Sequence, residues 1–557
     1  MTARPAGCML DGMNRREMIT AAAALAATPA LADTAVIVDS PAGQARGKTE
    51  TGVRVFKGLP YAAPPVGPAR WTPPKPLPRW PGVRDALTFG AASIQPKAGP
   101  ANPFVVDPAA MSEDCLFLNI WTPEGARDAP VMVWIHGGSL VSGYGHDAIY
   151  DGARLAAQGV VVVSINYRLG VLGYLAHPAL SAESPLGISG NYGLLDQIEA
   201  LRWVRANISA FGGDPARVTI AGQSAGALSV LYLMASPAAR GLFAGAIAES
   251  GYMISTPELK APNHGEPGAE AAGAFLAARL KAPDIAALRA LEPNKLTKAA
   301  YAAGWGPSGV VDGQVLPRQL VDAFDRGEAA AVPVLAGFNT GEISNLRFLA
   351  PPAPLSGRAY ESAIRARYGD LADTFLRLYP ATRIETSIQA ASRDALYGWT
   401  AERLVRSQAA AGRASFLYVF DHGYPALDTA GLHAFHGLEL PYVFGTLART
   451  PPFWAPAPAV PAEAALSRAM TAYWASFVKT GAPVAENQPT WPAHTPGGPS
   501  MAFQDTARTG VNLFPGAYDL QEEVVRRRRA RGDTPWNWNV GLAAPVLSAA
   551  ETQTPGP

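Results

Sequence analysis

The chain has 557 residues, of which 48% are hydrophobic and 16% are charged, and its formal net charge is +1. Such a chain can bury a large core, and it offers no broad basic face for nucleic acid. Its two cysteines, Cys8 and Cys115, exclude a disulfide framework and a thiolate zinc site.

The first 32 residues are typical of an export signal. The letters NRR at 14–16 precede an alanine-rich apolar run at 18–27, and ALA at 30–32 is the small-x-small pattern that precedes signal cleavage. The paired arginines predict that residues 1–32 are a signal peptide for twin-arginine export, with Met13 as an alternative start. We therefore expect a periplasmic or secreted protein; an uncleaved, disordered N-terminus is the alternative. No later run has the ~20 apolar residues that a membrane span needs.

Short apolar runs typical of buried strands recur along the rest of the chain. They are VMVWI at 131–135, VVVSINY at 161–167, VTIAG at 218–222, GAIAES at 245–250, VPVLAG at 332–337 and FLYVF at 416–420. Helical patterns lie between several of them, at 196–208 and 225–234 among others. This alternation predicts an α/β fold with a mostly parallel sheet covered by helices on both faces, in one domain from 33 to 520.

Two helix-prone stretches, at 257–320 and 347–402, are expected to form a cap over the site. The segment 521–557 is predicted to be a C-terminal tail. Its run Arg526–Arg529 follows two glutamates, and we interpret it as the solvated face of a late helix rather than a nucleic-acid or membrane patch.

The strand at 218–222 meets the helix at 225–234 in the letters GQSAG, with Ser224 at the corner. Such a turn strains its central residue and leaves room only for very small neighbours, which Gly222 and Gly226 supply. The strain points the hydroxyl out from the sheet edge, where the helix also aims free N–H groups. Ser224 is therefore a candidate nucleophile, and a glycine-lined turn with an incidental serine is the plainer alternative.

A serine nucleophile needs a base, and the base needs a carboxylate that orients it. In this strand–turn–helix context the order along the chain is serine, acid, histidine. The histidines after Ser224 are His264, His422, His433, His436 and His494. His436 follows the strand that ends at Phe420 and is favoured, with His433 as its main rival.

For the acid, Glu342 follows the strand at 332–337 directly, and Asp312 and Asp421 compete with it by type. The oxyanion that forms during attack needs preorganised N–H donors. The letters HGGS at 136–139 follow a strand and offer amides with little side-chain obstruction, and the N–H of Ala225 is expected on the other side of the site.

Seven longer stretches extend these motifs. They are FKGLPYAAPPVGPARWTPP at 56–74, SEDCLFLNIWTP at 112–123, VWIHGGSLVSG at 133–143, NYRLGVLGYL at 166–175, GNYGLLDQIEALRWVRANISAFGGDPARVTIAGQSAGA at 190–227, ESG at 249–251 and AFHGLELPYVFG at 434–445. Together they resemble the type-B carboxylesterase/lipase family, a group of α/β-hydrolases that includes the cholinesterases. The resemblance covers 38–503 and implies an α/β-hydrolase fold with helical cap insertions.

The resemblance also implies an activity and a set of site residues. The expected enzyme is a serine carboxylic-ester hydrolase that forms an acyl-enzyme on a small-molecule ester and needs no cofactor and no metal. The implied residues are the triad Ser224, Glu342 and His436, the oxyanion amides of Gly138, Ser139 and Ala225, and Ser250 as a support for the acid and the histidine. The stretch AFHGLEL favours His436 over His433, and GFNTGE favours Glu342 over the two aspartates.

The chain departs from the family pattern at several positions. Relatives usually have Glu at Gln223, a third Gly at Ser139, Gly at His433 and Asp at Gly341, and Ser93 replaces a cysteine that pairs with the one matching Cys115. The Ser139 side chain is expected to narrow the oxyanion hole. Cys115 is expected to be unpaired and buried.

Other activities stay open at this point. A non-catalytic cholinesterase-like binding module is one alternative, although such modules lose the nucleophile; a lipase or an amide or carbamate hydrolase is another. The aromatic residues weighed as pocket lining, against ordinary packing, are Trp305, Phe338, Trp399, Phe453 and Trp454. A monomer is favoured.

Overall fold

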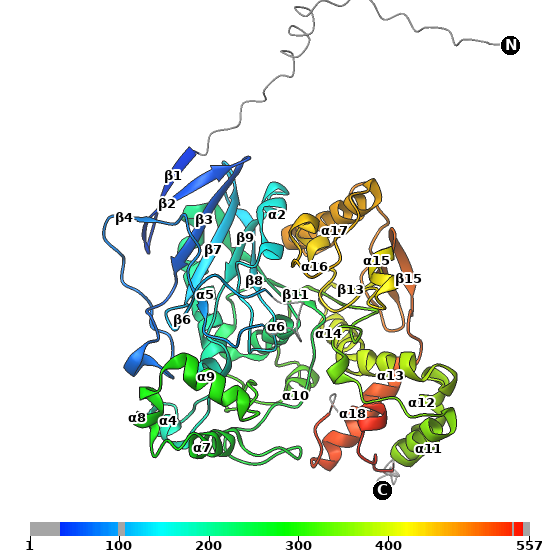
Figure 1. Cartoon of the computed structure of the whole chain (residues 1–557). Coiled ribbons are helices and arrows are strands. Elements are labelled where there is room, and N and C mark those ends of the chain that lie inside the picture. Colours follow the sequence, from blue (N-terminus) through cyan, green and yellow to red (C-terminus); the bar gives the residue numbers. More distant parts are fainter. Residues whose placement is uncertain (1–33, 99–105, 537–539, 550–557) are drawn as a thin grey trace, which may run out of the picture.

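The computed structural model describes residues 34–98, 106–536 and 540–549 (Figure 1). The predicted export signal, with Met13 and Cys8, lies outside the described residues. The strands are β1 (Thr34–Ser40), β2 (Gly43–Glu50), β3 (Val53–Pro60), β4 (Val83–Asp85), β5 (Ala92–Ser93), β6 (Met111–Ser112), β7 (Phe117–Pro123), β8 (Ala129–Ile135), β9 (Val161–Ile165), β10 (Gly213–Gln223), β11 (Gly245–Glu249), β12 (Val334–Asn339), β13 (Ser415–Phe420), β14 (Pro499–Phe503) and β15 (Ala507–Val511).

Helices fill the connections between consecutive strands from β8 to β14, and another follows β15. They are α2 (Ala153–Ala157), α3 (Gly170–Tyr174), α4 (Pro178–Glu183), α5 (Tyr192–Asn207), α6 (Ala225–Ala235), α7 (Ala269–Arg279), α8 (Ile285–Ala290), α9 (Pro293–Ala302), α10 (Leu320–Asp325), α11 (Gly357–Tyr368), α12 (Ala372–Leu378), α13 (Ile384–Arg393), α14 (Trp399–Ala410), α15 (Pro425–Thr429), α16 (Leu440–Val443), α17 (Pro461–Thr480) and α18 (Ala517–Arg531). None of the described helices is long and apolar enough to cross a membrane.

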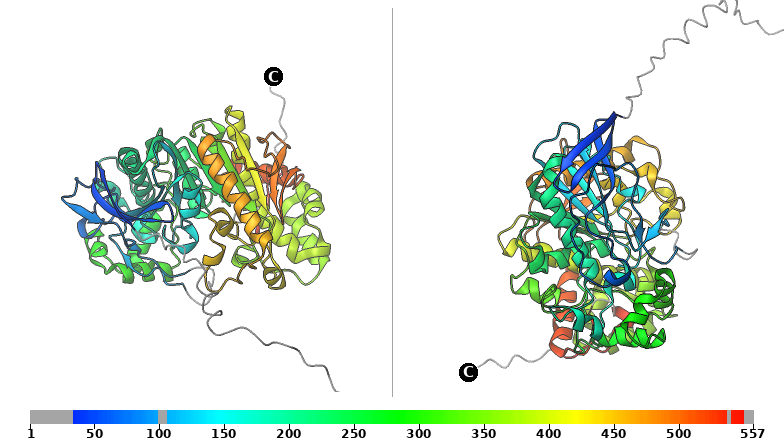
Figure 2. Two further views of the ribbon diagram at one scale, coloured as in Figure 1. Left: turned by 90° about the horizontal axis from the view of Figure 1, so that it is seen from above. Right: turned by 90° about the vertical axis from the view of Figure 1, so that its left-hand side faces the viewer.

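A 13-stranded sheet organises the described part of the chain, in the order β1-β2-β3-β7-β9-β8-β10-β11-β12-β13-β14-β15, with β4 beside β2, and β5 and β6 form a separate two-stranded sheet. The strands from β9 to β14 in that order are all parallel. Antiparallel strands extend the sheet at both ends. The mostly parallel sheet predicted from the apolar runs is confirmed, and Figure 2 shows the helices on its two faces.

The core lies on both faces of the sheet because alternate side chains of each strand point to opposite sides. In β8, Val131, Val133 and Ile135 join the cluster formed with α5 and α6. Met132 and Trp134 join the second cluster, which includes residues of α17. An unbroken apolar run is therefore what a doubly covered strand requires.

The two stretches predicted to form a cap are helical. The first contains α7, α8 and α9, and the second contains α11, α12 and α13, as Figure 1 shows. Buried side chains of α11 to α13 form a cluster with Leu520 and Val524 of α18. Helix α18 therefore spans the predicted boundary between the domain, which ends at 520, and the tail, which begins at 521, and it packs against the second cap segment.

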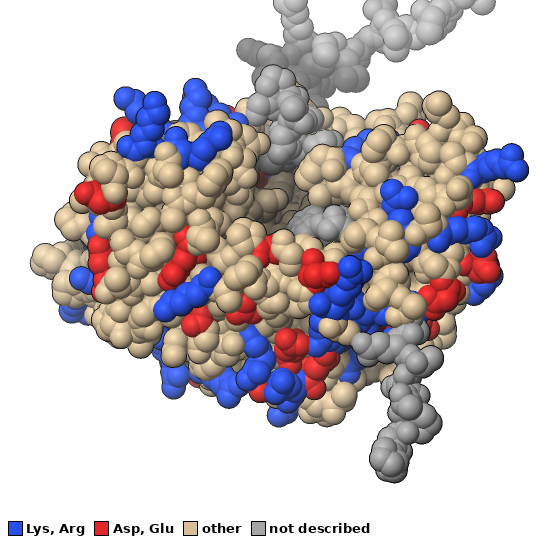
Figure 3. All heavy atoms as spheres, turned by 90° about the horizontal axis from the view of Figure 1, so that it is seen from below, with Lys and Arg blue, Asp and Glu red and all other residues tan. Residues whose placement is uncertain are grey.

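The prediction of a solvated arginine face on this late helix is wrong for two of its four residues. Arg527 and Arg528 are only 5% and 4% exposed. The Arg527 guanidinium lies 2.7 Å from Asp370 and 2.7 Å from Glu523. Its first partner is far away in sequence, so local charge patterning did not reveal that the cap covers this side of the helix. Acidic and basic side chains are interspersed over the face seen in Figure 3.

Candidate active site

Ser224 lies at the sharp corner between β10 and α6, near the middle of the sheet. Its backbone angles, φ 58° and ψ −123°, fall in a region that residues other than glycine rarely adopt. A Cβ on Gly226 would lie 2.1 Å from the carbonyl oxygen of Ile135, and one on Gly222 would lie 2.5 Å from the Gly226 carbonyl carbon. The predicted clearance is confirmed, because neither position admits even a methyl group.

Glu342 lies just beyond β12, fully buried, and contacts the ring of His436. The Ser250 hydroxyl donates a hydrogen bond to Glu342 Oε1 at 2.6 Å, and the backbone N–H of Asn339 donates to the same oxygen at 2.8 Å. The other carboxylate oxygen, Oε2, faces Nδ1 of His436. One carboxylate oxygen is thus fixed by the protein, and the second is directed at the imidazole.

The electrostatics of His436 follow from this partner. Burial alone lowers the pKa of an imidazole, but the Glu342 carboxylate outweighs it, and the pKa of His436 is raised above its ordinary value. An Nδ1–H that donates to Glu342 leaves Nε2 as the acceptor, which is the tautomer a general base requires.

The other histidines that follow Ser224 lie elsewhere. His433 contacts Asp421 and Asp428, His422 contacts Glu463, His264 packs edge-on against Trp536, and His494 contacts the Pro499 carbonyl. The two competing acids are also engaged, since Asp312 accepts from Asn191 and Asp421 accepts from Thr340. Two acid–histidine pairs therefore form among these candidates, Glu342 with His436 and Asp421 with His433. Of the two rings, His436 is the one that contacts the residue next to Ser224.

Nε2 of His436 lies 3.1 Å from the side-chain amide nitrogen of Gln223, the residue immediately before Ser224. Among the described residues, the Ser224 hydroxyl makes no hydrogen bond with His436. The imidazole thus faces the serine corner while its acceptor nitrogen is occupied by the neighbouring amide. Catalytic hydrogen bonds of this kind are often formed only when substrate is bound.

The HGGS loop lies against the serine corner. A Cβ on Gly137 would be 3.2 Å from the Ser224 Cβ. Gly138, Ser139 and Leu140 all have positive φ angles, 107°, 56° and 59°. Within the described ranges, the N–H groups of Gly138 and Ser139 donate to no other group, and no side chain caps the N-terminus of α6, where Ala225 stands. Unpaired amides on both sides of a hydroxyl form an anion-binding geometry.

Two further buried carboxylates near the site were not singled out from the sequence. Glu439 and Glu249 are both fully buried. Burial and the nearby Glu342 carboxylate raise the pKa of Glu439, and burial and Glu439 raise that of Glu249. The Trp474 indole donates to Glu249 at 2.7 Å. In the sequence, the position of Glu439 inside the apolar run LELPYVF was the one sign that this carboxylate is buried.

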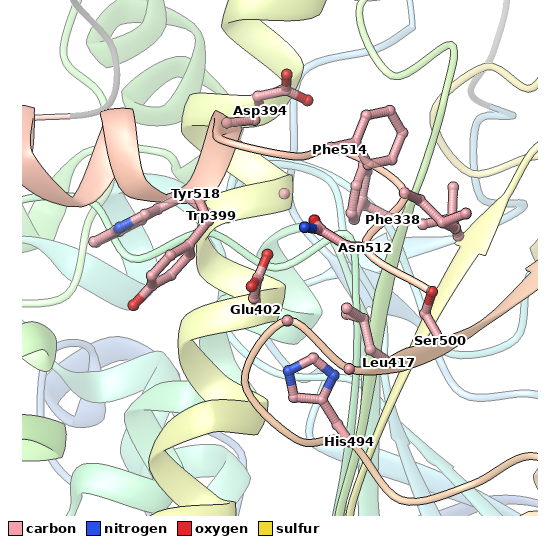
Figure 4. Close-up of a pocket in the computed structure, with 16 residues that line it drawn as sticks. Phe338, Asp394, Trp399, Glu402, Leu417, His494, Ser500, Asn512, Phe514 and Tyr518 are labelled. Atoms are coloured by element: carbon pink, nitrogen blue, oxygen red, sulfur yellow. The ribbon is translucent and has the colours of Figure 1, made fainter. Parts of the chain in front are cut away.

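The five aromatic residues that were considered as pocket lining lie in different environments. Phe338 and Trp399 line a pocket of about 40 Å³ between α14, β13 and the segment after β15, together with His494 and Glu402 (Figure 4). Ser224, Glu342 and His436 are not among its lining residues. Trp305 is partly buried against the core, Trp454 packs edge-on against Phe435, and Phe453 is exposed.

Cys115 is buried and unpaired, as expected, and burial raises the pKa of its thiol. Across the part of the chain that the structure describes, His, Cys, Asp and Glu side chains form no group suited to a metal ion.

The sheet order, the strained serine corner and the acid–histidine pair define an α/β-hydrolase fold. The sequence matches the carboxylesterase family over residues 34–513. The chain belongs to this family and is a carboxylic ester hydrolase.

Individual relatives agree with this assignment over most of their length. The fumonisin B1 esterase of Sphingopyxis macrogoltabida is 38% identical over 484 residues, which cover 83% of this chain and 86% of the relative. The para-nitrobenzyl esterase of Bacillus subtilis is 36% identical over 474 residues, covering 82% and 92%. A solved PNB esterase structure superposes with a TM-score of 0.72 at 32% identity, covering 88% of this chain and all of that one.

Proposed function

We propose that this esterase works through a Ser224–His436–Glu342 triad and an acyl-enzyme intermediate. The observation that carries the proposal is the buried Glu342 carboxylate on Nδ1 of His436, whose other nitrogen faces the residue next to Ser224. Ser250 supports the acid through its 2.6 Å hydrogen bond. The amides of Gly138, Ser139 and Ala225 are proposed to hold the oxyanion.

In the first step His436 takes the Ser224 proton as the hydroxyl attacks the ester carbonyl, and Glu342 stabilises the imidazolium that forms. His436 then returns that proton to the leaving alcohol, and the acyl group remains on Ser224. In the second step water loses a proton to His436 and attacks the acyl-enzyme; His436 then gives that proton to the departing Ser224 oxygen, which releases the acid and restores the serine. The Gln223 amide must release Nε2 before the first proton transfer, because one lone pair cannot accept both hydrogens.

The test is a Ser224→Ala variant assayed on a soluble p-nitrophenyl ester, together with labelling by a fluorophosphonate. We expect turnover to fall to the background rate while the unfolding midpoint stays near that of the wild type. Stoichiometric labelling is expected at Ser224 alone. A Ser224→Ala variant that turns over substrate at the wild-type rate would exclude the triad.

We also propose that residues 1–32 direct export of the mature enzyme by the twin-arginine route, on the support of the NRR and ALA patterns. Replacing Arg15 and Arg16 with lysine in the precursor should leave the esterase in the cytoplasm of a bacterial host. Unchanged activity in the periplasm or medium would contradict this route.

A further inference from the structure

His433 occupies an unusual position three residues before His436. Its backbone has a positive φ of 43°, a conformation that usually favours glycine. The ring lies between two carboxylates, with Nδ1 2.6 Å from Asp428 Oδ1 and Nε2 3.3 Å from Asp421 Oδ1. A carboxylate oxygen only accepts, so both contacts are hydrogen bonds only when both ring nitrogens carry a proton. The geometry is therefore that of an imidazolium.

Asp421 connects this ring to the end of the sheet. It follows β13, and its Oδ1 also accepts from the Thr340 hydroxyl at 2.6 Å. Its Oδ2 accepts from the Gln504 amide, beyond β14, at 2.8 Å. Thr340 lies two residues before Glu342. His433 is thus tied, through one carboxylate, to the loop that carries the proposed catalytic acid.

The same two loops are joined by their main chains. The Gly341 N–H donates to the Ala434 carbonyl at 3.0 Å, and the Ser344 hydroxyl donates to the Leu432 carbonyl at 2.7 Å. A Cβ on Gly341 would lie 2.8 Å from both of those carbonyl oxygens. The residues on either side of His433 therefore pack directly on the acid loop. Position 341 of that loop requires glycine, because no side chain fits there.

We propose that His433, held as a cation between Asp421 and Asp428, is a positioning residue that keeps His436 aligned with Glu342. This inference rests on the function proposed above. The charged groups that face the ring are Asp421, after β13, and Asp428, on α15. On α13, Arg393 donates to the carbonyl of Thr340, the residue whose hydroxyl donates to Asp421.

The His433 ring carries its charge over a defined range of pH. The hydrogen bond with Asp421, together with Asp428 and against the effect of burial, raises the pKa of His433 to about 9. Burial alone would raise the pKa of Asp421, but its bonds to His433, Thr340 and Gln504 lower it to about 2. Because a raised histidine pKa favours the folded loop only while the ring is charged, the bridge is complete at neutral pH and is lost as the pH rises through about 9.

The experiment compares His433→Gln, which removes the charge, with His433→Lys, which keeps a cation to higher pH. Asp428→Asn removes one half-exposed partner and serves as a second variant should the ring substitutions unfold the protein. kcat and KM are measured from about pH 6 to 10 with a soluble p-nitrophenyl ester, and Ser224→Ala provides the blank for alkaline hydrolysis.

We expect the wild-type kcat to decline as the pH rises through about 9, with little change in KM. His433→Gln should lower kcat about tenfold at neutral pH and abolish that decline, since misplacement of a catalytic group acts on kcat. His433→Lys should restore most of kcat and move the decline to higher pH.

A His433→Gln enzyme with the wild-type kcat and the wild-type alkaline profile would overturn the proposal. So would equal losses in the glutamine and lysine variants, because the charge would then have no role. Either outcome leaves the triad intact as long as Ser224→Ala is inactive. If Ser224→Ala is active instead, the proposed triad is excluded. The ion pairs of His433 with Asp421 and Asp428 are then still tested by measuring the unfolding midpoints of the wild type and the His433 variants as a function of pH.

Discussion

Replacing Glu342 with glutamine removes the charge of the proposed acid and almost none of its volume. The amide oxygen can still accept from Ser250 and from the Asn339 N–H. The amide NH₂, however, replaces the oxygen that faces Nδ1 of His436. The neutral amide cannot stabilise the imidazolium that forms in each transition state, and it favours the wrong imidazole tautomer.

The size of the effect follows from burial. Glu342 is 0% exposed, so solvent and salt screen the pair little. Opposite unit charges about 4 Å apart attract by about 4 kcal/mol at an effective dielectric constant near 20. At 1.36 kcal/mol per factor of ten, kcat should fall about a thousandfold.

The assay is steady-state hydrolysis of a soluble p-nitrophenyl ester, with urea unfolding as the check on folding. Asp312→Asn is the matched control, because Asp312 contacts Asn191 and not the imidazole, and its kcat should stay at the wild-type value. The reasoning is refuted if Glu342→Gln keeps more than about a tenth of kcat. A severe loss in Glu439→Gln alongside that result would move the acid role to Glu439.

Three other outcomes are expected. Gly226→Ala should abolish activity and lower the yield of folded protein, because its Cβ would lie 2.1 Å from the Ile135 carbonyl oxygen; normal kcat would contradict the crowding argument. Asp196→Asn breaks a buried bidentate pair with Arg168 and should destabilise the fold by about 3–5 kcal/mol, measured as a lower urea midpoint. Because the pKa of His436 is raised, kcat should fall with decreasing pH through a midpoint above 6.5, and a midpoint below that value would show that Glu342 does not dominate.

The parallel strands were predictable because strands covered on both faces have unbroken apolar runs. The antiparallel strands at the N-terminal end were not, and β2 shows why. Its sequence GQARGKTE places glycine, alanine and glycine inward and polar residues at the intervening positions, so no apolar run marks it. The burial of Arg527 also escaped prediction, because Asp370 lies 157 residues away in the sequence.

The site was predictable to the extent that local context places it. Ser224 and Glu342 each follow a recognisable strand, and parallel strands carry such residues to one edge of the sheet. The choice between His433 and His436 was different, because both lie in one loop after the same strand and the family resemblance was needed to decide between them. In the folded chain, the contacts of the loop backbone with Asn339, Gly341 and Asn345 determine which ring points at the acid.

These contacts bring Gly341 and the loop of His433 together. β12 and β13 are neighbours in parallel register, so the acid loop and the histidine loop leave the sheet side by side. With glycine at 341, the backbone on either side of His433 approaches so closely that a Cβ would clash with it. An aspartate at 341 does not fit that spacing. At the adjoining turn, the His433 ring contacts the carboxylates of Asp421 and Asp428. In this chain the acidic partners of the histidine loop lie at the end of β13 and on α15. We therefore expect the effects of substitutions at Gly341 and His433 on kcat not to be additive, because the two residues lie on contacting loops that carry Glu342 and His436.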